Sequence, residues 1–133
     1  MKKLTLILSM VSMMFAWDFA ANHKYDCTSY ALQIPDKNGK PQIIHKTMQN
    51  EAEFKRGLGD MYIIHIKAND PKHIVVTANN KSVEFDYNKT IDKGYKIFID
   101  KAQTMALMPN KEEKTKDLVL IFPNQTRVFY QCR

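Results

Sequence analysis

Between residues 61 and 87, apolar and polar side chains form three consecutive strand-like runs. The runs are MYIIHIKA (61–68), HIVVTA (73–78) and SVEFDY (82–87). In the third run Val83, Phe85 and Tyr87 alternate with polar residues, which predicts a strand with one buried and one solvent-exposed face. Turn-forming residues at 69–72 and 79–81 separate the runs. The region therefore predicts an antiparallel three-stranded meander.

The rest of the chain continues in the same rhythm, with apolar runs about every ten residues. Further strands are expected at 23–32, 42–46, 94–100, 103–108, 118–122 and 127–132. Within 23–32 the side chains Tyr25, Cys27, Ser29 and Ala31 share one face. Asn50, with Glu53 three residues later, predicts the start of one short helix, which Gly57 can end.

The two cysteines, Cys27 and Cys132, lie in the first and last predicted strands. An even number of cysteines in an exported chain predicts a disulfide, and this one would place the two strands side by side. We therefore expect an all-β fold, a small antiparallel meander barrel of eight or nine strands with one short helix. A β-sandwich is the alternative.

The N-terminus has the layout of a secretory signal peptide. Lys2 and Lys3 precede an apolar stretch at 4–15, and small residues follow. The prediction is a signal peptide at 1–21, cut after Ala20 or Ala21, followed by a single β-barrel domain at 22–133. A cut after Ala16 or a retained segment are the alternatives. The apolar stretch is too short for a stable membrane anchor, so the protein is expected in the periplasm or secreted.

Charge argues against nucleic acid as a partner. The chain carries a net charge of +6, and without residues 1–21 it keeps 18 basic and 13 acidic residues, a net charge of +5. The basic residues are mostly lysines scattered among acids, whereas nucleic-acid readers cluster lysine and arginine on one face. Scattered lysines keep a β-protein soluble and guard its edges.

No pattern in the sequence predicts catalysis. The four histidines lack metal-ligand spacing, and no nucleophile motif is present. His65 lies inside an apolar strand and is expected to be structural. Glu84 and Asp86 share a strand face with polar neighbours, as on a solvated surface. The sequence therefore predicts a protein that is not an enzyme and uses no cofactor or metal.

Two local features concern ligands and modification. The aromatic residues and Met48, Met61, Met105 and Met108 are expected to fill the barrel, although an eight-stranded barrel can also hold one small ligand. Asn88-Lys89-Thr90 is an N-glycosylation acceptor pattern. With Asp86 two residues earlier, it resembles the acidic acceptor pattern of bacterial oligosaccharyltransferases. The alternative is an ordinary polar turn.

The two ends of the chain carry a family resemblance. Tyr25-Asp26-Cys27 in the first strand, a meander of short strands and Cys132 in the last strand resemble the periplasmic inhibitors of C-type lysozyme, which are small eight-stranded barrels closed by a disulfide. The inhibitory loop of that family has Ser-Gly followed by Lys and Tyr. Here Lys93, Gly94 and Tyr95 keep part of the pattern without the serine.

The expected function is therefore that of a binding protein of the cell envelope. The resemblance implies an inhibitor whose partner is an envelope hydrolase, such as a wall-degrading enzyme, with 93–95 as the binding loop. Because C-type lysozymes are basic, a chain of charge +5 would fit a less basic enzyme better. The alternative is a lipocalin-like carrier that holds a small apolar ligand inside the barrel.

Overall fold

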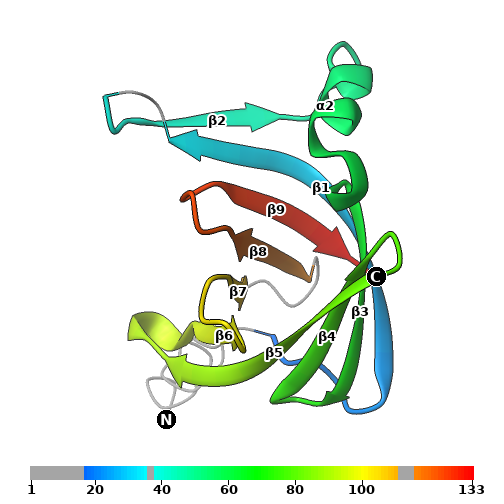
Figure 1. Ribbon diagram of the computed structural model, residues 1–133, viewed down its shortest axis with the longest axis vertical. Helices are drawn as coiled ribbons and strands as arrows, with labels where there is room; N and C mark the ends of the chain where they lie inside the picture. Colours follow the sequence, from blue (N-terminus) through cyan, green and yellow to red (C-terminus); the bar gives the residue numbers. More distant parts are fainter. Residues whose placement is uncertain (1–16, 36–37, 111–115) are drawn as a thin grey trace, which may run out of the picture.

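The structure is a computed structural model that describes residues 17–35, 38–110 and 116–133. The described residues form one antiparallel sheet of nine strands and one α-helix (Figure 1). The elements are β1 (His23–Pro35), β2 (Pro41–His45), α2 (Glu51–Leu58), β3 (Ile63–Asp70), β4 (His73–Ala78), β5 (Lys81–Thr90), β6 (Lys96–Asp100), β7 (Ala106–Pro109), β8 (Asp117–Ile121) and β9 (Arg127–Cys132). Two 3₁₀ turns, η1 (Gly59–Met61) and η2 (Asp92–Gly94), precede β3 and β6.

The sheet closes into a barrel because β1 pairs with two strands of the meander. Strands β3 to β9 follow one another in sequence order, and β1 hydrogen-bonds to both β3 and β9. Eight strands form the closed ring. The ninth, β2, pairs only with the far half of β1 and lies outside it (Figure 1). The predicted all-β barrel of eight or nine strands with one short helix is therefore confirmed, and the alternative sandwich does not form.

Strand β1 confirms the predicted alternation. Tyr25, Cys27, Ser29 and Ala31 are all buried, with at most 2% of their surface exposed. The pairing of β1 with β9 shifts by one residue between Ser29 and Ala31, which makes Tyr30 the extra residue of a β-bulge. Beyond the bulge, β1 changes its second partner from β3 to β2.

The predicted disulfide is confirmed. Cys27 and Cys132 are direct partners in the register of β1 and β9, and their sulfur atoms are bonded across a separation of 105 residues. Both side chains are buried. The bond therefore lies at the seam where the first and last strands of the barrel meet.

The inward-facing side chains fill much of the barrel. The largest fully buried ones are Phe19, Ile64, Ile66, Ile74, Phe85, Phe98, Leu107, Pro109, Leu118, Leu120, Val128 and Tyr130. Burial of one such side chain stabilises the fold by about 1.5–3 kcal/mol. Tyr130 is the largest of these side chains. Its hydroxyl donates a hydrogen bond to the Met61 carbonyl, so its polar group is satisfied inside the core. Burial also raises the pKa of Tyr130.

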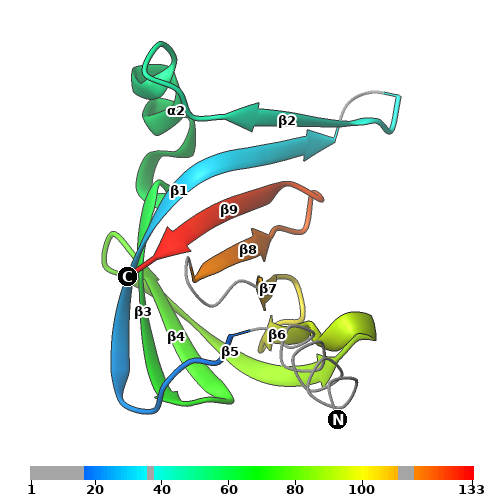
Figure 2. The ribbon, with the colours of Figure 1, turned by 180° about the vertical axis from the view of Figure 1, so that it is seen from behind.

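One end of the barrel is closed by the residues that precede β1. Trp17 and Phe19 are 4% and 1% exposed, and both belong to the hydrophobic core. Figure 2 shows this segment, in blue, running from the N-terminal trace to the start of β1. We call residues 17–21 the N-terminal plug. Residues 1–16 of the predicted signal peptide lie outside the described residues, so the peptide itself stays a prediction.

Helix α2 begins after Asn50, as expected, but the contacts of the Asn50 side chain and the glycine that ends the helix differ from the prediction. Asn50 occupies the N-cap position, but its side chain accepts a hydrogen bond from the Thr47 N–H and donates one to the His45 carbonyl. The amide therefore ties the helix to β2 instead of capping the free N–H groups of the first turn. Gly57 lies inside the helix, and Gly59, with φ of +55°, ends it.

Candidate functional site

The end of the barrel opposite the plug holds an apolar pocket, which we call the mouth pocket. The plug lies where β1 begins, and in the antiparallel order the β4–β5 turn, the start of β7 and the end of β8 lie at the other end. The mouth pocket has a volume of about 440 Å³. Its lining consists of Leu58, Asp60, Met61, Val76, Ala78, Lys81, Val83, Phe85, Met105, Leu120 and Phe122.

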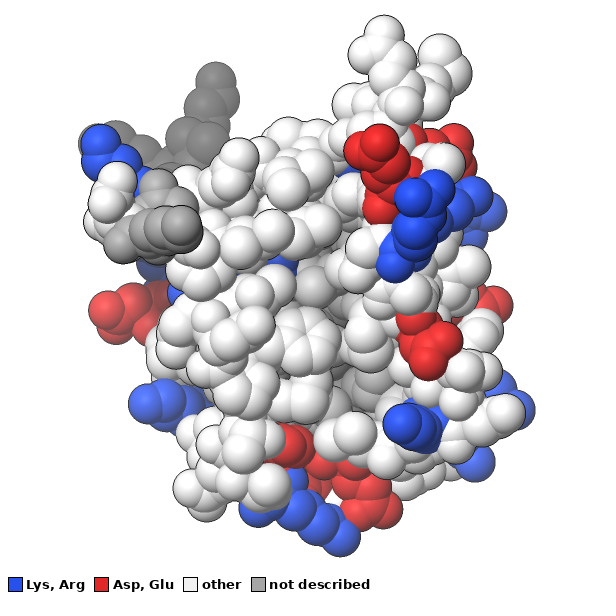
Figure 3. All heavy atoms as spheres, turned by 45° about the horizontal axis from the view of Figure 1, so that its top comes forward, with Lys and Arg blue, Asp and Glu red and all other residues white. Residues whose placement is uncertain are grey.

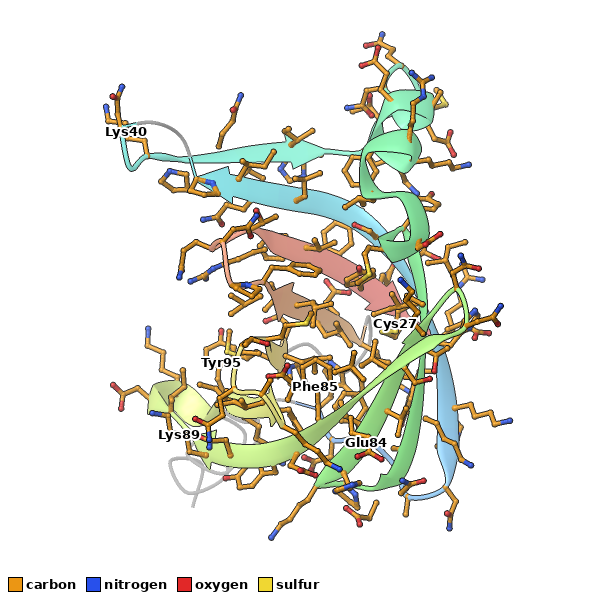
Figure 4. All side chains as sticks on the ribbon, viewed as in Figure 1. Cys27, Lys40, Glu84, Phe85, Lys89 and Tyr95 are labelled. Carbon is orange, nitrogen blue, oxygen red and sulfur yellow. A yellow bond between two sulfur atoms is a disulfide. The ribbon has the colours of Figure 1, made fainter. Side chains whose placement is uncertain are left out.

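The floor of the mouth pocket is part of the hydrophobic core. Val76, Phe85 and Leu120 are at most 5% exposed. Phe85 lies on the inward face of β5, as the alternation of 82–87 predicts (Figure 4). Val83, on the same face but nearer the strand end, is 36% exposed and forms part of the rim. The pocket is therefore the unfilled top of the barrel interior.

Among the described residues that line the mouth pocket, only Asp60 and Lys81 are charged. Both are exposed, and neither forms an ion pair with another residue of the described structure. The other described lining residues carry no titratable side chain. The mouth pocket can thus bury an apolar group while leaving a polar end at the rim.

Two further grooves lie beside helix α2, and both share Leu58 with the mouth pocket. One, of about 460 Å³, shares Leu58, Met61 and Phe122 with the mouth pocket. The other, of about 420 Å³, lies between α2 and the β1–β2 ribbon and also contacts Leu58. Figure 3 shows the face that carries α2, where the middle is hollowed and largely free of charge and the charged side chains lie mainly around the edge. Apolar surface therefore continues outward from the barrel end.

The predicted binding loop does not lie at the mouth pocket. Lys93, in η2, has a φ of +68° and is exposed, while Gly94, with φ of +82°, and Tyr95 are half-buried. Tyr95 comes just before β6 and lines a separate small pocket on the outer wall (Figure 4). Of these three residues, only Lys93 is fully presented to solvent.

The acidic and histidine residues considered from the sequence form separate cross-strand pairs on the outside of the barrel. His65 Nδ1 lies 2.7 Å from Asp26 Oδ1, and His73 pairs with Asp86. Glu84 pairs with Lys101 at 2.6 Å. Glu84 and Asp86 thus bind different partners and do not face a common substrate site. Within the described ranges, no group of three or more His, Cys, Asp or Glu side chains is arranged to hold a metal ion.

Asn88 lies where the pairing of β5 with β6 shifts by one residue. Tyr87 pairs with Phe98 and Lys89 with Ile97, which leaves Asn88 as the extra residue of a bulge. Its side chain is exposed. The Tyr87 N–H still bonds to the Lys72 carbonyl, but beyond Tyr87, within the described residues, β5 pairs with β6 alone. The acceptor pattern is therefore accessible.

No family model, curated protein or solved structure matches the chain. The resemblance to lysozyme inhibitors therefore rests on the residues and the barrel alone. In the part of the chain that the structure describes, none of the helices is long and apolar enough to cross a membrane.

Sequence reasoning found part of the mouth pocket and missed the rest. Met61 and Met105 were expected either to fill the barrel or to line a cavity, and both line the pocket. Leu58 and Asp60 lie between the predicted helix end at Gly57 and the predicted strand run at 61–68, and the sequence pattern predicts no role for them. Their role depends on how the α2–η1 segment folds across the end of the barrel, and a local pattern carries no signal for this.

Proposed function

We propose that this chain is an exported, non-enzymatic binding protein that holds a small apolar ligand in the mouth pocket. The observation that carries the proposal is a barrel closed at one end by Trp17 and Phe19 and left unfilled at the other. A volume of about 440 Å³ lies within the range of small-molecule sites, which are mostly apolar with a few polar groups. The same geometry favours the carrier alternative over the loop-based inhibitor.

The chemistry of the lining supports binding over catalysis. In the described part of the chain, the charged groups that line the pocket are Asp60 and Lys81, and both lie at its exposed rim. Catalytic sites typically bring titratable groups with shifted pKa values together in a cleft. An apolar floor with a polar rim instead favours an amphipathic ligand whose polar end stays near solvent.

The disulfide supports the proposed location. Disulfides persist in oxidising compartments, so the Cys27–Cys132 bond indicates a non-reducing environment. Together with the predicted signal peptide, it supports a periplasmic or secreted protein. In such a compartment a small barrel can carry apolar molecules through water.

The proposal is tested with a neutral fluorescent probe, N-phenyl-1-naphthylamine, titrated into the purified protein. Val83→Asp places a charge at the pocket rim and should weaken probe binding at least tenfold. Ile91→Asp is a matched control, because Ile91 is 38% exposed, against 36% for Val83, and follows the far end of β5. Native mass spectrometry of protein purified from its own cells should show a co-purifying small molecule, which Val83→Asp removes.

Two results would overturn the proposal. One is equal probe binding by Val83→Asp, Ile91→Asp and the parent, and the other is the absence of any enhancement of probe fluorescence by the parent. A stoichiometric protein partner in native mass spectrometry, with no small molecule, would instead favour the inhibitor hypothesis. That hypothesis stays a prediction.

A further inference from the structure

A second, smaller pocket lies on the outer wall of the barrel, away from the mouth pocket. It has a volume of about 160 Å³ and lies over β7, β8, β9 and the bulge of β1. Its lining includes Tyr30, Tyr95, Met108, Asp117, Arg127 and Phe129. We call it the wall pocket. Three of these six side chains are aromatic, and one is a carboxylate.

The carboxylate of Asp117 is only partly satisfied. Its Oδ2 accepts a hydrogen bond from the Tyr30 hydroxyl at 3.2 Å, whereas Oδ1 is buried and has no hydrogen-bond partner among residues 17–35, 38–110 and 116–133. A buried carboxylate oxygen without a partner is unfavourable and rare, and usually has an explanation such as an ion or a ligand. Asp117 also lines the wall pocket, so this incompletely compensated negative charge lies beside the space that a positively charged group could occupy.

The backbone holds this carboxylate in place. The carbonyl oxygen of Asp117 accepts hydrogen bonds from Trp17 Nε1 at 2.8 Å and from the Asn110 N–H at 2.7 Å. Asp117 also pairs with Gln131 in the β8–β9 ladder. These bonds fix the main chain at Asp117, and the Tyr30 hydroxyl orients the carboxylate, so less conformational freedom is lost when a ligand binds.

The aromatic rings add a second reason for a cation to bind. The rings of Tyr30 and Phe129 lie with their centroids 6.3 Å apart and their planes at 45°. Burial, reinforced by the negative charge of Asp117 and the hydrogen bond to it, raises the pKa of Tyr30 to about 12. Tyr30 is therefore neutral at physiological pH. Neutral aromatic faces attract ammonium and guanidinium groups through the ring quadrupole.

We propose that the wall pocket binds an organic cation, an alkylammonium or guanidinium group, between the aromatic rings and the Asp117 carboxylate. The size fits this chemistry, since a protein cavity of about 150 Å³ accommodates benzene. The cation can come from a free small molecule or from a lysine or arginine side chain of a protein partner. The site is separate from the mouth pocket, so the two proposals stand or fall independently.

Arg127 is the group that opposes such a ligand. In the β8–β9 pairing, Arg127 lies opposite Ile121 and Gln131 lies opposite Asp117. The two pairs are four residues apart along β9, so the backbone of Arg127 lies about 13 Å from the Asp117–Gln131 pair at about 3.3 Å per residue. Within the described residues its guanidinium forms no ion pair with Asp117. Because Arg127 also lines the wall pocket, its positive charge should weaken cation binding, which makes it a useful control.

The test is an NMR titration of the full chain with n-butylammonium and with the neutral n-pentanol, which has nearly the same size. Tetramethylammonium, N-acetyl-lysine methylamide and N-acetyl-arginine methylamide distinguish a free quaternary cation from a protein side chain as the source. The cations should shift the ring resonances of Tyr30 and Phe129, and n-pentanol should not. Asp117→Asn should weaken cation binding at least tenfold.

Two variants keep the outcome decisive. Arg127→Gln should leave cation binding equal or tighter, and Phe129→Leu, which keeps an apolar side chain but removes the ring, should weaken it severalfold. Unchanged melting temperatures for Asp117→Asn, Arg127→Gln and Phe129→Leu would show that the barrel is intact in each variant. The proposal fails if n-pentanol binds as well as n-butylammonium, if Asp117→Asn binds like the parent, or if Arg127→Gln loses cation binding, because removal of an opposing positive charge should not weaken it.

Discussion

The indole ring of Trp17 meets the ring of Phe19 edge-on, with 4.8 Å between the ring centroids, in the end of the barrel where β1 begins. The Phe19 ring in turn contacts those of Tyr25 and Phe98 at 5.7 and 5.4 Å. Asp18, between the two aromatic residues, forms an ion pair with Lys96. The plug is therefore held by rings from two strands and by one charged pair.

The plug leads to a prediction about processing. A cut after Ala20 or Ala21 would remove two core rings, and loss of one buried Phe or Trp side chain typically costs about 3–5 kcal/mol. We therefore expect the folded protein to retain Trp17, with any signal peptide removed before it. Intact mass gives the N-terminus, and Trp17, the only tryptophan, should give blue-shifted fluorescence.

Phe19→Ala tests the energetic part of this prediction. We expect it to lower the free energy of unfolding by about 3–5 kcal/mol, measured by denaturant titration. Ala21→Gly, at an exposed position of the same segment, should change it by less than about 1 kcal/mol. A stable mature protein that begins at residue 21 or 22 and gives no tryptophan emission would show that the barrel does not need the plug.

The barrel could be predicted from sequence because its signals are local. Period-two alternation identified the buried face of β1, and the turn clusters at 69–72 and 79–81 identified the meander. The position of Cys27 and Cys132 in the first and last strands then predicted closure, which the pairing of β1 with β9 confirms. Each step used neighbouring residues or one covalent constraint.

The plug and the pockets could not be predicted in the same way. Trp17 follows an apolar stretch, so a local reading assigns it to the signal peptide, although its indole hydrogen-bonds 100 residues away at Asp117. Val83 was expected on a buried face, but it lies at the strand end that forms the pocket rim. The wall pocket depends on Tyr30, which a bulge adds to the strand. Such roles follow from closure of the barrel and are not visible in any short stretch.

The disulfide leads to a prediction about stability. A bond that closes a loop of 105 residues contributes about 4–5 kcal/mol in the chain-entropy model, which is a large share of the stability of a small domain. Reduction should lower the melting temperature by more than about 10 °C while the folded fraction keeps its sheet content. Circular dichroism measures both. Rapid reaction of two thiols with a maleimide in the native, unreduced protein would contradict the bond.

The turn between β6 and β7 should depend on pH through Asp100. Its carboxylate is 8% exposed and accepts hydrogen bonds from the Thr104 N–H, the Thr104 hydroxyl and the Met105 N–H at 2.8–3.0 Å. Burial alone would raise the pKa of Asp100, but these hydrogen bonds favour the charged form more strongly and lower it. The ionised carboxylate therefore stabilises the folded state above the ordinary pKa of an aspartate, and this contribution is lost as the pH falls through the lowered pKa.

Asp100→Asn measures that contribution. At pH 7 it should lower the free energy of unfolding by about 1–3 kcal/mol, because hydrogen bonds to a charged acceptor are lost. The difference from the parent should shrink below about pH 4, as the parent carboxylate takes up a proton. Asp60→Asn, at an exposed position, should have little effect at either pH. A constant difference between parent and Asp100→Asn from pH 7 to pH 2 would contradict a role for the charge.

The last prediction concerns Asn88. The residue is exposed at a bulge where, within the described residues, β5 pairs with β6 alone, and Thr90, also exposed, supplies the hydroxyl of the acceptor pattern. We expect Asn88 to receive a glycan when the protein is exported in a bacterium that has an N-oligosaccharyltransferase, because an acceptor must be accessible. Intact-mass spectrometry should show a single added glycan, lost in Asn88→Gln.

Asn124→Gln is the control: Asn124 has the same acceptor spacing without the acid, and its side chain already accepts a hydrogen bond from the Thr126 N–H at 3.1 Å. Asp86→Ala separates the need for the acid from accessibility, since it leaves the asparagine in place but also breaks the pair with His73; His73→Ala breaks that pair alone. An unmodified parent protein in such a host, or a glycan that persists in Asn88→Gln, would leave the bulge as an ordinary feature of β5.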